Sequence, residues 1–365
     1  MKTRPNKLSA EAPASASVAK NYRMPAEWEP HEATWLAWPH HHPDWPGKFE
    51  PIPWVYAEII RHLAYHERVE LIVNDAVSEK RARQVLTSAN ALNDNVRFHR
   101  WPTDRVWTRD SGCTFVKNIH HADSHPAAIH WRFNAWAKYS NWHRDEKIGS
   151  LMAKAVRAKE ICPRVGQNRI VLEGGAIDVN GRGTLITTEE CLLSETQQRN
   201  PGMGREDYEK LFAEHLGIKR VIWLGKGITG DDTHGHIDDL ARFVSPNTVV
   251  TVNETNPKDP NYKPLRDNLR RLRVAKTERG RPLNIVELPM PRPVFFKGTR
   301  VPASYANFYI ANGIVLVPTF NDPNDRVVLN TLAGLFPNRE VVGIYCGDLV
   351  WGFGTLHCMT QQQPR

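Results

Sequence analysis

A hairpin-like unit that recurs along the chain is the feature that most constrains the fold. Two alternating apolar runs flank Asn180-Gly181 within Ile177–Thr187, and the same pattern flanks Asn312-Gly313 within Phe308–Phe320. Asn-Gly between such runs is the strongest short-range signal for a two-residue hairpin turn. Weaker signals predict hairpins within Leu240–Asn253 and after Cys113–Asn118. Apolar residues at helical spacing predict helices between these units, at Val55–Tyr65, Ala76–Ala91, Asp207–Leu216 and Lys263–Arg273.

A polar residue stands some five to eight residues ahead of each hairpin turn: Asp110, Glu173, Asp238 and Asn307. Repeated units that each present a side chain from the same place are typical of modules arranged around a common axis. Such side chains can meet at one point although they lie far apart in the sequence. The pattern therefore favours a closed α/β array over an open doubly wound sheet. The chain has neither GxGxxG after a strand nor GxxxxGK[ST], so it carries no nucleotide-cofactor motif.

The charge balance raises the question of nucleic-acid binding. The 365 residues include 48 Lys and Arg against 40 Asp and Glu, a net charge of +8. The densest basic run, Leu265–Arg281, has Leu265, Leu269 and Leu272 at helical spacing. This spacing predicts a helix whose basic outer face, with Arg266, Arg270, Arg273 and Lys276, is solvated. No nucleic-acid motif accompanies it, and no stretch approaches the ~20 apolar residues that span a bilayer, so neither partner is expected.

The five cysteines include no CxxC pair, which favours a reducing compartment over a disulfide framework or a structural zinc site. Residues 1–23 are basic and rich in Ala and Ser but lack the apolar core of a secretory signal. We expect a disordered tail over 1–23 and one catalytic domain over 24–365 in a cytoplasmic protein; an organellar address is the alternative. The sequence allows a homo-oligomer without specifying one.

Two residues could supply nucleophilic chemistry. Cys358 lies in GTLHCMTQQQP, where a cysteine is more commonly a small core residue. A catalytic thiolate would need an imidazole, which His236 in DDTHGHIDD could provide. His234 and His236 could instead bind a metal, but no third ligand is adjacent. The flanking acids, Asp231, Asp232, Asp238 and Asp239, would repel one another unless a cation sits among them or they form a solvated cluster.

Two further acids stand in suggestive surroundings. Glu173 ends an apolar run and precedes two glycines, which allow a ligand or another backbone to approach closely; a simple turn acid is the alternative. Asp110 follows Trp107 and Arg109. An aromatic face and a carboxylate together suit a flat cation such as a guanidinium, although Arg109 and Asp110 could also form an ordinary surface pair.

Taken together, WTRD, LEGG, HxD and GTLHC resemble the agmatine deiminase family, which is grouped with the Porphyromonas-type peptidyl-arginine deiminases among the guanidine-modifying enzymes. The resemblance runs from Met24 to the C-terminus. It implies a single-domain, five-module pseudo-symmetric α/β propeller of the pentein type, with its site on the central axis. It also implies the site residues: Cys358 as nucleophile, His236 as general acid/base, Glu173, Asp110 and Asp238 as acids that hold the guanidinium, Trp107 as an aromatic wall, Asp232 near the distal amine, and Asn307 as a further site residue.

The resemblance implies hydrolysis of agmatine to N-carbamoylputrescine and ammonia through a covalent amidino-cysteine, with no metal or organic cofactor. The acidic pair Asp231 and Asp232 favours the distal amine of agmatine over a carboxylate. A deiminase of free or peptidyl arginine, an amidinotransferase and a non-enzymatic metal-binding protein are the alternatives. The sequence departs from the family pattern in two places, with THGH for TNGH and GTLHC for GNIHC. These departures bear on which substrate tail is bound and not on the reaction. The other four cysteines are expected to be dispensable.

Overall fold

Five sheets of three or four strands form the framework of the computed structural model, which describes residues 21–120 and 126–365. Three sheets share one plan, in which an antiparallel pair is followed by a crossover helix and a strand parallel to the second one. Their elements are β10 (Asp178–Val179), β11 (Thr184–Thr188), α6 (Arg205–Leu216) and β12 (Arg220–Leu224); β13 (Ala241–Ser245), β14 (Thr248–Asn253), α7 (Tyr262–Val274) and β15 (Asn284–Pro289); and β18 (Tyr309–Ala311), β19 (Ile314–Thr319), α8 (Pro323–Leu335) and β20 (Glu340–Tyr345).

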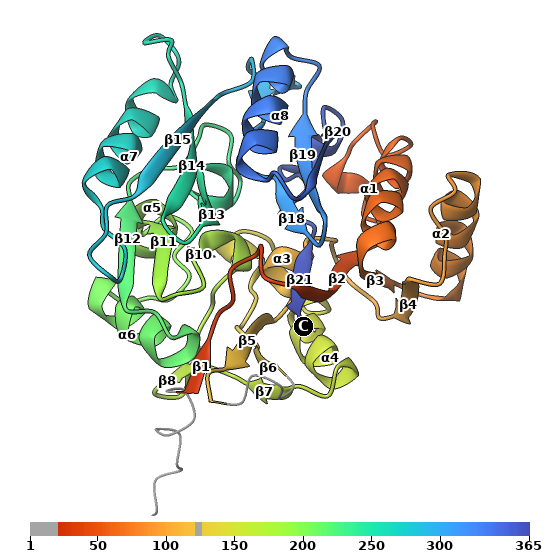
Figure 1. The fold of residues 1–365 in the computed structure, drawn as a ribbon. Coiled ribbons are helices and arrows are strands. Elements are labelled where there is room, and N and C mark those ends of the chain that lie inside the picture. Colours follow the sequence, from red (N-terminus) through yellow and green to blue (C-terminus); the bar gives the residue numbers. More distant parts are fainter. Residues whose placement is uncertain (1–20, 121–125) are drawn as a thin grey trace, which may run out of the picture.

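The other two sheets extend this plan by one strand. One contains β5 (Thr114–Asn118), β6 (Ala127–Ile129), α4 (Ile148–Ala155) and β7 (Lys159–Ile161), with β1 (Tyr22–Arg23) at its edge. The other contains β21 (Gln361–Pro364), β2 (His31–Ala37), α1 (Ile52–His66), β3 (Arg68–Val73), α2 (Ala76–Ser88) and β4 (Val96–Arg100). Because β21 pairs with β2, this sheet joins residues from both ends of the chain. In Figure 1 the crossover helices lie toward the outside, and β10, β13, β18 and β21 lie toward the middle.

The predicted hairpins and helices are confirmed, and Asn312-Gly313 forms a two-residue turn, whereas the loop at Asn180-Gly181 is longer because Val179 pairs with Leu185. Gly181 and Gly313 adopt φ angles of 69° and 70° in the β10–β11 and β18–β19 turns, a region that glycine enters without steric cost. The four predicted helices correspond to α1, α2, α6 and α7. On α7 the three leucines are buried, while Arg266, Arg270 and Arg273 are exposed. None of the described helices combines the length and apolar character needed to cross a bilayer.

The start of the ordered domain differs from the sequence boundary. Most of the expected tail lies outside the described residues. Tyr22 and Arg23, which the sequence assigned to that tail, form β1 and pair with Asn118 and Lys117 of β5. The structured part therefore begins before Met24, because these two residues complete the edge of a sheet.

A fully buried arginine connects three of the sheets. Arg242 on β13 donates from Nε to Asp178 Oδ2 on β10 at 2.6 Å, and from Nη1 to the carbonyl of Phe308, next to β18, at 2.6 Å. Its Nη2 lies 2.8 Å from Glu27 Oε1, in the segment before β2. Charges removed from water are tolerated only when they are paired, so this network fixes the positions of the three sheets relative to one another.

We predict that Arg242→Met lowers the free energy of unfolding by about 3–5 kcal/mol, because two buried carboxylates lose their cation. Urea denaturation followed by circular dichroism measures the change. Arg270→Met is the matched control, since Arg270 is exposed on α7 and its loss should cost less than about 0.5 kcal/mol. Equal effects of the two substitutions would contradict the linking role of Arg242.

Candidate active site

Each of the five sheets contributes a polar or nucleophilic residue from the segment just ahead of its first hairpin strand. These residues are Asp110 on the short helix α3 (Thr108–Ser111) before β5, Glu173 before β10, Asp238 in the helical turn η6 (Ile237–Asp239) before β13, Asn307 before β18 and Cys358 before β21. The sequence pattern revealed four of these positions, and Cys358 is the fifth. The structure brings these residues and His236 together in one buried cluster.

A cavity of about 220 Å³ leads to this cluster. Its lining includes Cys358, Asp110 and the indole rings of Trp107 and Trp136. Cys358 is only 6% exposed, so the cavity is the route by which a small molecule reaches the sulfur. Trp107 therefore forms part of the wall, as the sequence analysis expected, while Trp136 is an addition that the sequence analysis did not identify.

The sulfur of Cys358 is buried beside one amide donor and several carboxylates. Asn307 Nδ2 donates to Sγ at 3.0 Å, and Sγ lies 3.6 Å from Asp238 Oδ2. Burial, together with the negative charges of Asp238, Asp239 and Asp110, raises the pKa of the Cys358 thiol well above its usual value. The thiol is therefore neutral at pH 7 unless a positive charge enters the cavity.

His236 lies among three carboxylates. Its Nε2 is 3.8 Å from Glu173 Oε2, and its Nδ1 is 3.9 Å from Asp110 Oδ2 and 4.0 Å from Asp238 Oδ1. Burial favours the neutral ring, but Asp110 and Glu173 raise the pKa of His236 well above its usual value. The ring is thus an imidazolium that can donate a proton.

Several buried polar atoms of this cluster have no hydrogen-bond partner among the described residues. They are both ring nitrogens of His236, Glu173 Oε2 and Asp238 Oδ1. Unpaired buried polar atoms cost about 1–3 kcal/mol each, so their concentration at one point calls for a ligand. Two of them are carboxylate oxygens, which suit a cation with several N–H donors.

The second oxygen of each of two acids is held by a side-chain nitrogen. Glu173 Oε1 accepts from the buried Arg199 Nε at 3.1 Å, and Asp238 Oδ2 is 2.7 Å from His357 Nδ1. Although burial opposes ionisation, Arg199 and His236 lower the pKa of Glu173 to about 2. The His357 hydrogen bond likewise lowers the pKa of Asp238 against the effect of burial. Both acids are therefore ionised, each with one oxygen left free.

Asp110 is held differently, by neutral donors alone. Gly175 N donates to Oδ1 at 3.0 Å, and Trp136 Nε1 donates to Oδ2 at 2.8 Å. Burial raises the pKa of Asp110 to about 6. Trp136 itself has a left-handed backbone (φ 60°), as do Ala135 and Ala137, and such residues cost roughly 1–2 kcal/mol each. This strained turn places the indole against Asp110, which is typical of functional segments.

The acidic residues of the stretch 231–239 do not all face the cavity. Asp231, which the sequence analysis placed at the mouth with Asp232, instead accepts hydrogen bonds from the backbone of Thr233, Gly235 and His236. Its carboxylate therefore shapes the loop that carries His236. His234 has turned aside, with Nε2 3.2 Å from Ser194 Oγ, and does not line the cavity.

Asp232 lines the mouth of the cavity, as the sequence analysis expected, but it is not free. It accepts from the Tyr139 hydroxyl at 2.6 Å and pairs with Lys138. A second pair, Asp44 with Arg105, lines the same mouth. The sequence analysis found no basic residue in the stretch around Asp232, but these two cations arrive from distant segments.

Within residues 21–120 and 126–365, two groups of side chains could offer ligands to a metal ion. His130, Glu160 and Cys162 lie near the surface, and Glu173, Cys191 and His236 lie in the candidate site. In the second group one atom from each residue lies within 4.8 Å of the others. A metal there would need a neutral His236, but the acidic groups around that ring raise its pKa well above the usual value. No local pattern in the sequence indicated that Cys191, on the short helix α5 (Glu189–Leu193), lies beside His236.

A buried cysteine and an imidazolium among anchored carboxylates, in a framework of five small sheets, agree with one known class of protein. The family model for Porphyromonas-type peptidyl-arginine deiminases matches residues 23–364, and the chain belongs to this family.

One similar sequence and two similar solved structures extend this comparison from the family to individual proteins. The chain is 35% identical to an agmatine deiminase of Pseudomonas fluorescens, over 96% of this chain and 97% of that protein. The solved structure of an Enterococcus faecalis agmatine deiminase is 30% identical, with a TM-score of 0.85 over 94% of this chain and 96% of the other. A Porphyromonas gingivalis protein provisionally assigned as an arginine deiminase is 35% identical, with a TM-score of 0.83 over 94% and 98%. The mixed α/β single-domain fold is shared with these structures.

We predict that alkylation of Cys358 by iodoacetamide keeps accelerating through pH 9, because only the thiolate reacts, and burial together with the surrounding carboxylates raises the pKa of this thiol. Mass spectrometry of the peptide that contains Cys358 follows the rate at each pH. Free cysteine, with a reference pKa near 8.5, is the comparison. A rate that levels off below pH 8 would show a preformed thiolate and contradict the prediction.

Proposed function

We propose that the protein is an agmatine deiminase, a cysteine-dependent hydrolase that converts the guanidinium of agmatine to N-carbamoylputrescine and ammonia. The observation that carries this proposal is the group of unpartnered, buried polar atoms around Cys358. A planar guanidinium has N–H donors pointing in several directions and a delocalised positive charge, which match these acceptors. The agmatine deiminases among its relatives support the same substrate.

Substrate binding would bring a positive charge close to the Cys358 sulfur. Asp238 Oδ1 and Glu173 Oε2 would accept guanidinium N–H bonds, with Asp110 alongside and Trp107 against the flat face. The cation would then lower the pKa of Cys358 and offset its three carboxylate neighbours, so that the sulfur ionises only when substrate is present. The thiol proton leaves to water. This dependence would protect the nucleophile from side reactions between turnovers.

Attack of the thiolate on the guanidinium carbon would form a C–S bond and a neutral tetrahedral adduct. The His236 imidazolium would protonate one amino group, which departs as ammonia and leaves a cationic amidino-cysteine. Neutral His236 would next take a proton from water as its oxygen attacks the same carbon. Collapse of this second adduct expels the Cys358 thiolate, and loss of a proton gives the carbamoyl product. No step requires an oxidant or reductant.

The opposite end of the substrate would be recognised at the mouth. The distal ammonium of agmatine would replace Lys138 on Asp232, since the two cations compete for one carboxylate. Asn307 would act on the nucleophile and not on the substrate tail, because its amide contacts Cys358 Sγ.

A deiminase of free or peptidyl arginine is the second candidate, and one observation favours it. Arg105 and Lys138 bring two cations to the mouth, where a carboxylate could bind. Ammonia release from agmatine, arginine and a peptide ending in arginine separates the candidates. Faster turnover of arginine than of agmatine would overturn our assignment. Transfer of the amidino group to an added amine in place of water would instead identify an amidinotransferase.

We further propose that the five sheets form a pseudo-symmetric propeller of the pentein type, and that the catalytic domain begins at β1, two residues ahead of the expected boundary at residue 24, and runs to residue 365. The shared strand plan and the position of one site residue ahead of each sheet support this arrangement. A cytoplasmic location is supported by the five unpaired cysteines.

For the chemistry, we predict that Cys358→Ser lowers kcat at least roughly 10⁴-fold, because a neutral hydroxyl is a far weaker nucleophile here. His236→Ala should be comparably severe, since it removes the proton donor and the later base. Mass spectrometry of parent protein quenched during turnover should find added mass on the Cys358 peptide. Cys113→Ser, a buried cysteine outside the site, is the control. If Cys358→Ser kept most of the activity, the mechanism would need replacing.

For specificity, we predict that Asp232→Asn raises the KM for agmatine about tenfold or more, because a partly buried carboxylate–ammonium contact is worth a few kcal/mol at most. Lys138→Met should have the opposite effect and lower that KM, since it removes the competing cation. Steady-state kinetics with agmatine and arginine measure both changes. An unchanged KM in Asp232→Asn would show that the tail binds elsewhere.

A further inference from the structure

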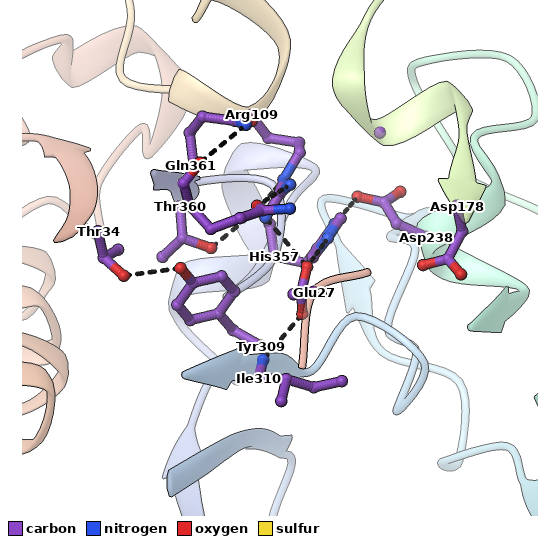
Figure 2. A network of polar contacts seen from close by, with 12 residues as sticks. Glu27, Thr34, Arg109, Asp178, Asp238, Tyr309, Ile310, His357, Thr360 and Gln361 are labelled. Carbon is purple, nitrogen blue, oxygen red and sulfur yellow. Dashed lines mark hydrogen bonds and ion pairs between the residues drawn. The ribbon is translucent and has the colours of Figure 1, made fainter. Parts of the chain in front are cut away.

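His357, the residue before the nucleophile, lies between two carboxylates. Its Nδ1 is 2.7 Å from Asp238 Oδ2, and its Nε2 is 2.8 Å from Glu27 Oε2. The ring is 2% exposed and does not line the substrate cavity. Figure 2 shows it bridging the segment that carries Asp238 and the segment that carries Glu27. No motif in the sequence indicated this contact.

The number of protons on this ring follows from its partners. A neutral imidazole has one N–H donor, and an ionised carboxylate can only accept. Glu27 is ionised, because it lies 2.8 Å from Arg242 Nη2 and accepts from Arg109 at 3.3 Å and from the backbone of Ile310 at 2.8 Å. With Asp238 also ionised, two acceptors face the two ring nitrogens. The ring must then be an imidazolium that donates from both.

We propose that His357 is a positioning residue for the reaction: its ring donates from one nitrogen to Glu27 and from the other to Asp238, and so fixes one oxygen of Asp238 and leaves the other for the guanidinium. This inference rests on the proposed function. In the free protein Asp238 Oδ1 has no partner among the described residues, which is the oxygen that the proposal assigns to substrate.

The other acids of the site show what such a cation does. Glu173 is arranged in the same way, with Arg199 on one oxygen and the other oxygen unpartnered. Asp110 has only neutral donors, and burial raises its pKa to about 6. An Asp238 without His357 would therefore be expected to have a raised pKa, as Asp110 does.

The charged and titratable groups around the ring come from four segments. They are Glu27 before β2, Arg109 on α3, Asp238 and Arg242 around η6 and β13, and Tyr309 and Cys358 near the C-terminal strands. Of these groups, only the two carboxylates contact the ring nitrogens, whereas Arg109 and Arg242 contact Glu27. The immediate surroundings of the ring therefore favour the imidazolium.

The test compares His357→Ala, which removes ring and charge, with His357→Gln, which keeps an N–H donor without the charge. The pH dependence of kcat/KM for agmatine is measured for both. We expect a loss of about 10²-fold or more at pH 7 for His357→Ala, and in both variants an acid limb displaced by at least one unit to higher pH, because Asp238 must be ionised to bind the cation. His130→Gln is the matched control: this buried histidine is 2.7 Å from Glu160 but outside the site, and its acid limb should not move.

A second measurement does not depend on activity. In protein labelled with ¹⁵N-histidine, the signals absent from His357→Gln belong to His357, and we expect both ring nitrogens to remain protonated above pH 7.5. A neutral ring at that pH, or a His357→Ala enzyme that keeps kcat/KM within threefold and an unshifted acid limb, would overturn the proposal. If His357→Ala does not fold, the ¹⁵N chemical shifts of the His357 ring in the parent protein test the proposal instead. Parent protein that turns over no agmatine would refute the proposed function, while those shifts would still test the ring.

Discussion

The site depends on cations that lie behind its carboxylates. Glu173, Asp110 and Asp238 each come within about 4 Å of His236, and such a group of like charges would repel and protonate in a buried place. Arg199 and His357 prevent this for two of the acids, and each takes one oxygen and leaves one. The same device repeats outside the site, where Arg242 lies against Glu27 and Asp178. Breaking any such pair leaves an unpaired buried charge, which is why the arrangement is rigid.

Much of the framework could be predicted from local pattern. Asn180-Gly181 and Asn312-Gly313 specify their hairpins because only a few residues enter the left-handed region cheaply. Leu265, Leu269 and Leu272 define the inner face of α7 by spacing alone. The helix α8 was missed, although Asp322 and Asp325 form a reciprocal cap at its start that the sequence displays.

The site could be predicted only in part, because its motifs name the residues that face substrate and not those that hold them. Arg199 is reached from Glu173 across 26 residues, and Glu27 from His357 across 330. No local spacing carries such information. The cations at the mouth show the same limit: Lys138 and Arg105 meet Asp232 and Asp44 only through tertiary structure. The charges within residues 231–239 alone therefore do not predict the charge at the mouth of the cavity. Asp231 was expected at this mouth, but its carboxylate accepts hydrogen bonds from the loop that carries His236.

The pairing of β21 with β2 has a consequence for how the protein matures. Cys358 is three residues ahead of the strand that aligns Gln361 with Trp35, so its final position depends on a contact between segments more than 300 residues apart. Contacts of such separation form late, since the long intervening loop must first be ordered. A chain in which β21 has not yet paired with β2 would contain every reactive group and still lack the site, because this pairing sets the position of Cys358 relative to the acids.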